Sequence, residues 1–137
     1  MDSSNDSAVT IATPFRIAFL PQRERNKMKI GFIGLGNVGG KLAKSLLRNK
    51  FKLTVIDLNN SLVKDFISKG SETAKSPKEL AEKVDLIITC LPSPKICADV
   101  MEKKDGVIEG LSKNKIWLEM STTDSNEVKR IGALVKS

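Results

Sequence analysis

The stretch Met28-Lys-Ile-Gly-Phe-Ile-Gly-Leu-Gly-Asn-Val-Gly-Gly-Lys41 decides the fold of this chain of 137 residues. A short apolar run leads directly into the glycine pattern Gly34-x-Gly36-x-x-Gly39, and a helical pattern follows at once. In such a strand–turn–helix unit the first glycine permits a tight turn, the second lets a pyrophosphate approach the backbone, and the third lets the helix pack on the strand. The start of the helix would offer free N–H groups to phosphates. The stretch therefore predicts a dinucleotide-binding βαβ unit.

An acidic residue at the end of the next apolar run supports this interpretation. The run Leu53–Ile56 ends on Asp57, whose carboxylate could accept hydrogen bonds from both hydroxyls of a ribose and would repel a 2′-phosphate. We therefore expect NAD, with NADP the less favoured cofactor. A Walker-type phosphate loop is excluded, because Leu42 follows Gly40-Lys41 where a Ser or Thr would hold Mg²⁺. A glycine turn that binds no nucleotide remains the alternative.

From Met28 onward, strand patterns alternate with helical ones, which predicts a single parallel sheet covered by helices. Strands are expected near residues 28–33, 53–56, 72–74, 84–91 and 116–120. Helices are expected after Gly39, before Gly70, from Ser76-Pro77, from Ser93-Pro94 and from 124–127. The carboxyl ends of parallel strands share one edge of the sheet, where ligands bind. Four loops should meet there: Gly34–Gly39, Asp57–Asn60, Leu91–Pro94 and Met120–Asp124.

The composition excludes several classes of protein. The net charge of +7 comes from scattered lysines with few aromatic residues, so we favour a solvated basic surface over a nucleic-acid interface. No apolar run approaches the roughly 20 residues that a membrane helix needs. The two cysteines, Cys90 and Cys97, are expected to be free thiols rather than metal ligands, because the chain has no histidine. Without histidine the chain also lacks the commonest general base.

Residues 1–27 differ from the rest and are expected to be a disordered leader, with residues 28–137 as the folded domain. A secretory signal is disfavoured, because the apolar stretch is short and is broken by Pro14, Arg16 and Pro21. A mitochondrial presequence stays open, although Asp2 and Asp6 count against it. We therefore expect a cytoplasmic protein, with the mitochondrial matrix as the alternative.

Several motifs in this order resemble those of a known family. They are Phe32-Ile-Gly-Leu-Gly-Asn-Val-Gly-Gly-Lys-Leu-Ala43, Ser76-Pro-Lys-Glu79, Asp85-Leu-Ile-Ile-Thr-Cys-Leu-Pro-Ser-Pro94 and Leu118-Glu-Met-Ser-Thr122. Together they resemble the amino-terminal domain of the β-hydroxyacid dehydrogenases, which include 3-hydroxyisobutyrate dehydrogenase and 6-phosphogluconate dehydrogenase. The resemblance covers residues 28–137 and implies a Rossmann-type, doubly wound parallel sheet.

By position, the resemblance implies a set of cofactor-binding residues. They are Gly34, Leu35, Gly36, Asn37, Val38, Gly39, Asp57, Leu58, Leu91, Pro92 and Thr122. It also places Ser121 and Thr122 beside the nicotinamide and the carboxylate of a substrate, although both could serve as a plain helix cap. The implied reaction transfers hydride between NAD and a small hydroxyacid or its semialdehyde.

Three departures from the family pattern qualify this expectation. Val38 and Leu42 stand where the family usually has Met, a harmless apolar exchange. Glu119-Met120 precedes Ser121 where the family usually has Asp-Ser or a close variant. The third departure is the absence of the glycine-rich block that carries the catalytic Lys on a second, all-α domain, which also forms the family's oligomer interface. The 137 residues are thus expected to contain no catalytic residue.

Two other functions remain open from the sequence. One is a stand-alone nucleotide-binding module without catalysis. The other is a different Rossmann protein, such as a methyltransferase that binds S-adenosylmethionine.

Overall fold

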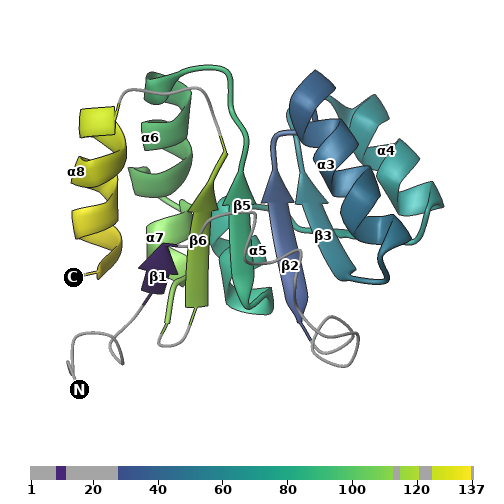
Figure 1. Cartoon of the computed structure of the whole chain (residues 1–137), viewed down its shortest axis with the longest axis horizontal. Helices are drawn as coiled ribbons and strands as arrows, with labels where there is room; N and C mark the ends of the chain where they lie inside the picture. The colour runs from purple at the N-terminus through teal and green to yellow at the C-terminus, as the bar shows by residue number, and fades with distance from the viewer. Residues whose placement is uncertain (1–8, 12–27, 113–114, 121–124, 137) are drawn as a thin grey trace.

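The computed structural model describes residues 9–11, 28–112, 115–120 and 125–136. These residues form one six-stranded sheet in the order β1-β6-β5-β2-β3-β4, and every neighbouring pair is parallel (Figure 1). The strands are β1 (Val9–Ile11), β2 (Lys29–Ile33), β3 (Lys52–Ile56), β4 (Glu72–Thr73), β5 (Leu86–Thr89) and β6 (Lys115–Glu119). The five strands expected from the sequence are therefore confirmed, with boundaries shifted by a few residues.

Helices cover both faces of the sheet. They are α3 (Asn37–Arg48), α4 (Asn60–Ser68), α5 (Pro77–Lys83), α6 (Pro94–Glu102), α7 (Val107–Gly110) and α8 (Ser125–Lys136). Alternate residues of β5 belong to different cores: Leu86 and Ile88 pack with residues of α3 and α4, whereas Ile87 packs with residues of α5, α6, α7 and α8. Because side chains alternate along a strand, this division marks a sheet buried on both faces. The predicted doubly wound, Rossmann-type fold is confirmed.

Two of the predicted helix starts have the serine caps that the sequence indicates. The hydroxyl of Ser76 accepts a hydrogen bond from the N–H of Glu79 at 3.1 Å, and that of Ser93 accepts one from Ile96 at 3.2 Å. Proline follows each of these serines at the first helical position, where its missing N–H costs no hydrogen bond. Gly70 follows α4 with a positive φ of 105°, the conformation that ends many helices. The expected start of α8 at Asp124 lies outside the described residues.

The short helix α7 was not expected from the sequence. It packs between α5 and α6, and a Cβ at Gly110 would overlap the carbonyl oxygen of Lys78. Four residues are too few for a helical period to show in the sequence.

β1 corrects the expectation for the leader. Val9–Ile11 was assigned to a disordered segment, but it pairs in parallel with β6, in the register Val9 with Lys115 and Ile11 with Trp117. It takes the sixth place in the usual strand order 3-2-1-4-5-6 of such sheets. The physical reason is that the edge of β6 is a template on which an extended segment can form backbone hydrogen bonds, whatever its own sequence pattern. The rest of residues 1–27 lies outside the described residues.

Among the described residues, no helix has the length and apolar character required to cross a lipid bilayer.

Candidate functional site

The turn after β2 is wedged between two neighbouring strands. Gly34 has a φ of 102°, which side-chain-bearing residues rarely adopt, and its N–H donates to the carbonyl oxygen of Ile56 on β3 at 3.0 Å. On the other side, a Cβ at Gly34 would overlap the carbonyl oxygen of Cys90, directly after β5. Only glycine satisfies both the conformation and the space, so the tight turn predicted at this position is confirmed.

The other two glycines of the fingerprint differ from each other. A Cβ at Gly39 would overlap the carbonyl oxygen of Gly34, so α3 packs directly against the turn. A Cβ at Gly36, by contrast, would have none of the other described residues within 4 Å. Nothing in the fold therefore demands glycine at position 36, and the space above its backbone is open to a ligand.

The start of α3 faces this open space. Gly36 is the residue that precedes the helix, and no side chain forms a capping hydrogen bond there. The first turn also contains no acidic residue. A helix start of this kind offers N–H groups and a partial positive charge to an anion. Backbone, charge and space thus fit the phosphates of a dinucleotide.

The side chains predicted around the turn have different environments. Val38 is 63% exposed and Leu58 is fully exposed, so both could contact a ligand. Leu35 is 2% exposed and packs in the core, which leaves only its backbone for such a contact. This restricts the role implied for Leu35 by the family resemblance.

Asp57 connects the glycine turn to the loop after β3. Its Oδ2 accepts a hydrogen bond from the N–H of Leu35 at 2.6 Å, and its Oδ1 accepts one from the N–H of Asn59 at 2.8 Å. The sequence predicted Asp57 beside the turn but not these two bonds. Each carboxylate oxygen can accept a second hydrogen bond. Binding of ribose hydroxyls by Asp57 is compatible with this geometry and stays a prediction.

The loop after β5 borders the same turn. The side chain of Leu91 comes within 3.2 Å of the place that a Gly34 Cβ would occupy, and Pro92 is exposed. These two residues therefore lie at the carboxyl edge, as predicted. Ser121 and Thr122, the residues predicted beside a substrate, lie outside the described residues.

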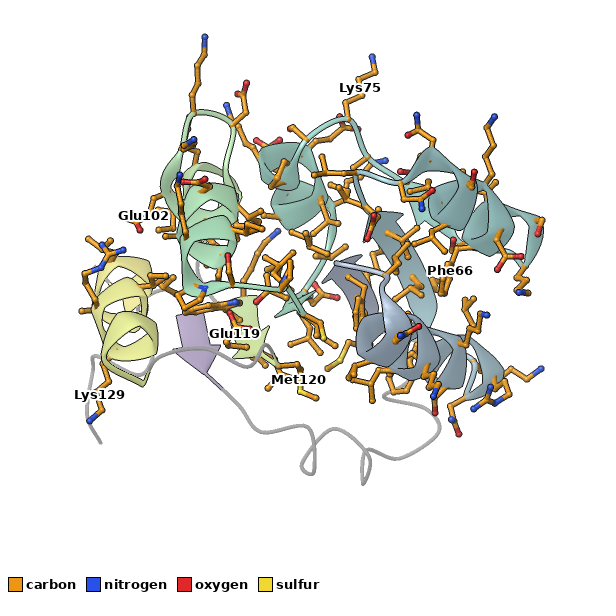
Figure 2. All side chains as sticks on the ribbon, turned by 90° about the horizontal axis from the view of Figure 1, so that it is seen from above. Phe66, Lys75, Glu102, Glu119, Met120 and Lys129 are labelled. Carbon is orange, nitrogen blue, oxygen red and sulfur yellow. The ribbon has the colours of Figure 1, made fainter. Side chains whose placement is uncertain are left out.

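A polar network at the ends of β5 and β6 was missed by the sequence analysis. The indole N–H of Trp117 donates to Thr89 Oγ1 at 2.9 Å, and that hydroxyl donates to Glu119 Oε2 at 3.0 Å. The thiol of Cys97, on α6, donates to the same carboxylate oxygen at 2.6 Å. Figure 2 shows Glu119 beneath α6, with Met120 on the side toward α3. The only signal in the sequence was the unusual Glu119 before the Ser-Thr pair.

Cys90 lies close to the glycine turn. The Cys90 Cβ is 3.3 Å from the place that a Gly39 Cβ would occupy. Burial, and to a lesser degree the charge of Glu119, raises the pKa of the Cys90 thiol. Cys90 and Cys97 form no disulfide bond, and no group of side chains suited to a metal ion occurs among the described residues.

Comparisons with known proteins agree with this geometry. Residues 29–137 match the family described as the NAD-binding domain of 6-phosphogluconate dehydrogenase. The mitochondrial 3-hydroxyisobutyrate dehydrogenase of Mus musculus is 35% identical over 116 residues, which cover 80% of this chain and 35% of the mouse protein. The 3-sulfolactaldehyde reductase of Escherichia coli K12 is 38% identical over 93 residues, which cover 68% of this chain and 31% of the reductase. The chain spans about a third of the length of these relatives.

Solved structures share the fold. An imine reductase from a Pseudomonas species superposes with a TM-score of 0.71 and 26% identity, over 80% of this chain and 38% of the reductase. Imine reductases of Myxococcus stipitatus superpose with TM-scores of 0.69, one in complex with NADP⁺ at 16% identity and a variant in complex with NAD⁺ at 17%. These two alignments cover 77% and 78% of this chain and 36% of each reductase. Neighbours of this fold therefore bind either dinucleotide.

Proposed function

We propose that this chain, which belongs to the family described as the NAD-binding domain of 6-phosphogluconate dehydrogenase, binds NAD for a hydroxyacid oxidoreductase. Its homology to 3-hydroxyisobutyrate dehydrogenase supports this proposal. The bound dinucleotide would supply the hydride acceptor or donor, and the protein would supply binding and orientation. The substrate class is a small hydroxyacid or its semialdehyde. The observation that carries the proposal is the open space over Gly36 at the start of α3.

Different residues of this chain would bind different parts of the dinucleotide and the substrate. The N–H groups at the start of α3 would hold the pyrophosphate, and Asp57 would accept hydrogen bonds from the adenosine ribose. Val38 and Leu58 would cover apolar parts of the dinucleotide from either side of the turn. By resemblance, Ser121 and Thr122 would bind the substrate carboxylate. The general base and the oligomer interface would come from an all-α domain of the kind found in the family.

The proposal is tested by titrating the chain with NADH and following the NADH fluorescence. The unsubstituted chain should bind, and Gly36→Ala should lower the affinity at least about tenfold, because its methyl group would occupy the space of the phosphates. The melting temperature of Gly36→Ala should stay within about 1 °C, because the added methyl group meets none of the other described residues. Absence of NADH binding at millimolar concentration would contradict the proposal. A thermal shift with S-adenosylmethionine alone would support a methyltransferase instead.

We further propose that the chain prefers NAD to NADP, because the Asp57 carboxylate would repel a 2′-phosphate. Asp57→Ala should weaken NADH binding by about 1–3 kcal/mol, the scale of hydrogen bonds to a charged group. Asp57→Asn is the matched variant, since it keeps an acceptor beside the turn without the charge, and it should raise the affinity for NADPH. Equal affinities of the unsubstituted chain for NADH and NADPH would contradict this role.

For the compartment we propose the cytoplasm, with the mitochondrial matrix as the alternative, since the mouse relative is named as mitochondrial. Imaging of the chain with a carboxyl-terminal fluorescent tag distinguishes the two.

A further inference from the structure

The proposed function assigns no role to Glu119, a charged side chain at the carboxyl ends of the neighbouring strands β5 and β6. Dinucleotides bind across the point where the strand order reverses, with one nucleotide over each half of the sheet. Here the order reverses between β2 and β5, and Asp57 lies in the half that contains β3. The nicotinamide nucleotide is thus expected over β5 and β6. Glu119 is the last residue of β6.

The carboxylate of Glu119 is held in place by two buried donors. Thr89 has no exposed surface and Cys97 is 1% exposed, and both donate to Glu119 Oε2, at 3.0 Å and 2.6 Å. The Thr89 hydroxyl is itself oriented by the indole N–H of Trp117. These bonds tie the end of β6 to β5 and to the beginning of α6. The position of this negative charge is therefore set by the fold.

The field of this charge extends along the carboxyl edge. It contributes to the raised pKa of the thiol of Cys90, directly after the neighbouring strand β5, although burial is the larger cause. Cys90 in turn lies against Gly39 of the glycine turn. A charge in partly buried surroundings acts over such distances because the screening by water is incomplete.

We propose that Glu119 favours the oxidised over the reduced form of the nicotinamide cofactor. The oxidised nicotinamide ring carries a positive charge and the reduced ring is neutral, whereas the phosphates carry the same charge in both forms. A fixed carboxylate beneath that half of the site attracts only the oxidised ring. The inference rests on the proposed function, because it requires that the chain binds the dinucleotide.

The test compares the dissociation constants for NAD⁺ and NADH, measured by calorimetry on the full chain. Glu119→Gln should raise the ratio of the dissociation constant for NAD⁺ to that for NADH by about three- to tenfold, which lies between the Coulomb interactions over roughly 10 Å in bulk water and at a protein surface. Glu119→Asp keeps the charge and should keep the ratio within about twofold. Glu82→Gln is the matched control, because it removes the same charge from an exposed residue at the end of α5, before β5 begins.

The outcomes separate the charge from a structural role. A merely structural role of Glu119 would change both dissociation constants by the same factor, and an unchanged ratio in Glu119→Gln would overturn the inference. A change of the ratio in Glu82→Gln as large as in Glu119→Gln would overturn it as well. Failure of the unsubstituted chain to bind either form would overturn the proposed function, and the inference with it.

A second variant guards against misfolding of Glu119→Gln. The double substitution of Glu119→Met with Cys97→Ala removes the carboxylate together with one of its two buried donors, so that only the Thr89 hydroxyl loses its acceptor. It should show the same three- to tenfold rise in the ratio, on the same electrostatic ground. An unchanged ratio in this folded double variant would contradict the inference.

Discussion

The two halves of the carboxyl edge of the sheet differ in whether backbone or side chains form them. The half with β2, α3 and β3 is formed mostly by backbone: Gly34 and Gly39 leave no room for a Cβ, and the N–H groups of Leu35 and Asn59 fix Asp57. The half with β5, α6 and β6 is formed by side chains, which meet at Glu119. Few backbone conformations form such a turn, whereas many different combinations of side chains can form a hydrogen-bond network. The first half is thus defined by the fold and the second by the particular sequence.

The largest expected effect is in the backbone half. Gly39→Ala should lower the free energy of unfolding by about 3 kcal/mol, because the new Cβ would overlap the carbonyl oxygen of Gly34 and neither backbone segment can move freely. Urea unfolding measures the change. Gly36→Ala is the control from the same turn and should change the free energy by less than about 0.5 kcal/mol. Equal stability of the two variants would mean that the backbone of this half is not rigid.

A smaller effect is expected in the side-chain half. Thr89→Val should lower the free energy of unfolding by about 1–3 kcal/mol, because the indole N–H of Trp117 loses its acceptor and the Glu119 carboxylate loses a donor. Thr89→Ser keeps the hydroxyl and should restore most of this loss. Urea unfolding with tryptophan fluorescence suits the measurement, since Trp117 is the one tryptophan. If Thr89→Val were as stable as the unsubstituted chain, the network would not contribute to holding this half together.

The smallest effect concerns the attachment of α8 to the second half. Arg130 donates to both carboxylate oxygens of Glu102 on α6, at 2.9 Å and 2.5 Å, and these hydrogen bonds lower the pKa of Glu102. Because the pair is partly exposed, Arg130→Gln should cost only about 0.5 kcal/mol at pH 7.

The pH dependence of this effect has a definite sign. A carboxyl group whose pKa is lowered in the folded state stabilises the fold above its unfolded pKa and ceases to do so as the pH falls through the folded pKa. The difference between Arg130→Gln and the unsubstituted chain should therefore disappear in acid, below the lowered pKa of Glu102. Thermal unfolding measured from pH 7 downward until Glu102 is protonated checks this, and a difference that stays undiminished once the carboxyl group is protonated would contradict the ion pair as its cause.

The sequence predicted the backbone half well and the side-chain half poorly. Three glycines at fixed spacing and Asp57 after the next strand predict this turn, because Gly34 and Gly39 meet backbone requirements that few other residues meet. The contact of Cys97 with Glu119 spans the same sequence separation as that of Leu35 with Asp57, but no spacing rule pairs a cysteine with a glutamate at these positions. The strand β1 was missed for a similar reason: three residues are too few for a reliable strand pattern, and pairing with β6 decides their structure.

β1 also has a consequence for the order in which the sheet can assemble during synthesis. Its partner β6 follows about a hundred residues later in the chain, so on the ribosome β1 must wait for its partner until those residues have been translated. The neighbouring strands β2 and β3 can pair much sooner. The strand made first is therefore expected to be the last to join the sheet.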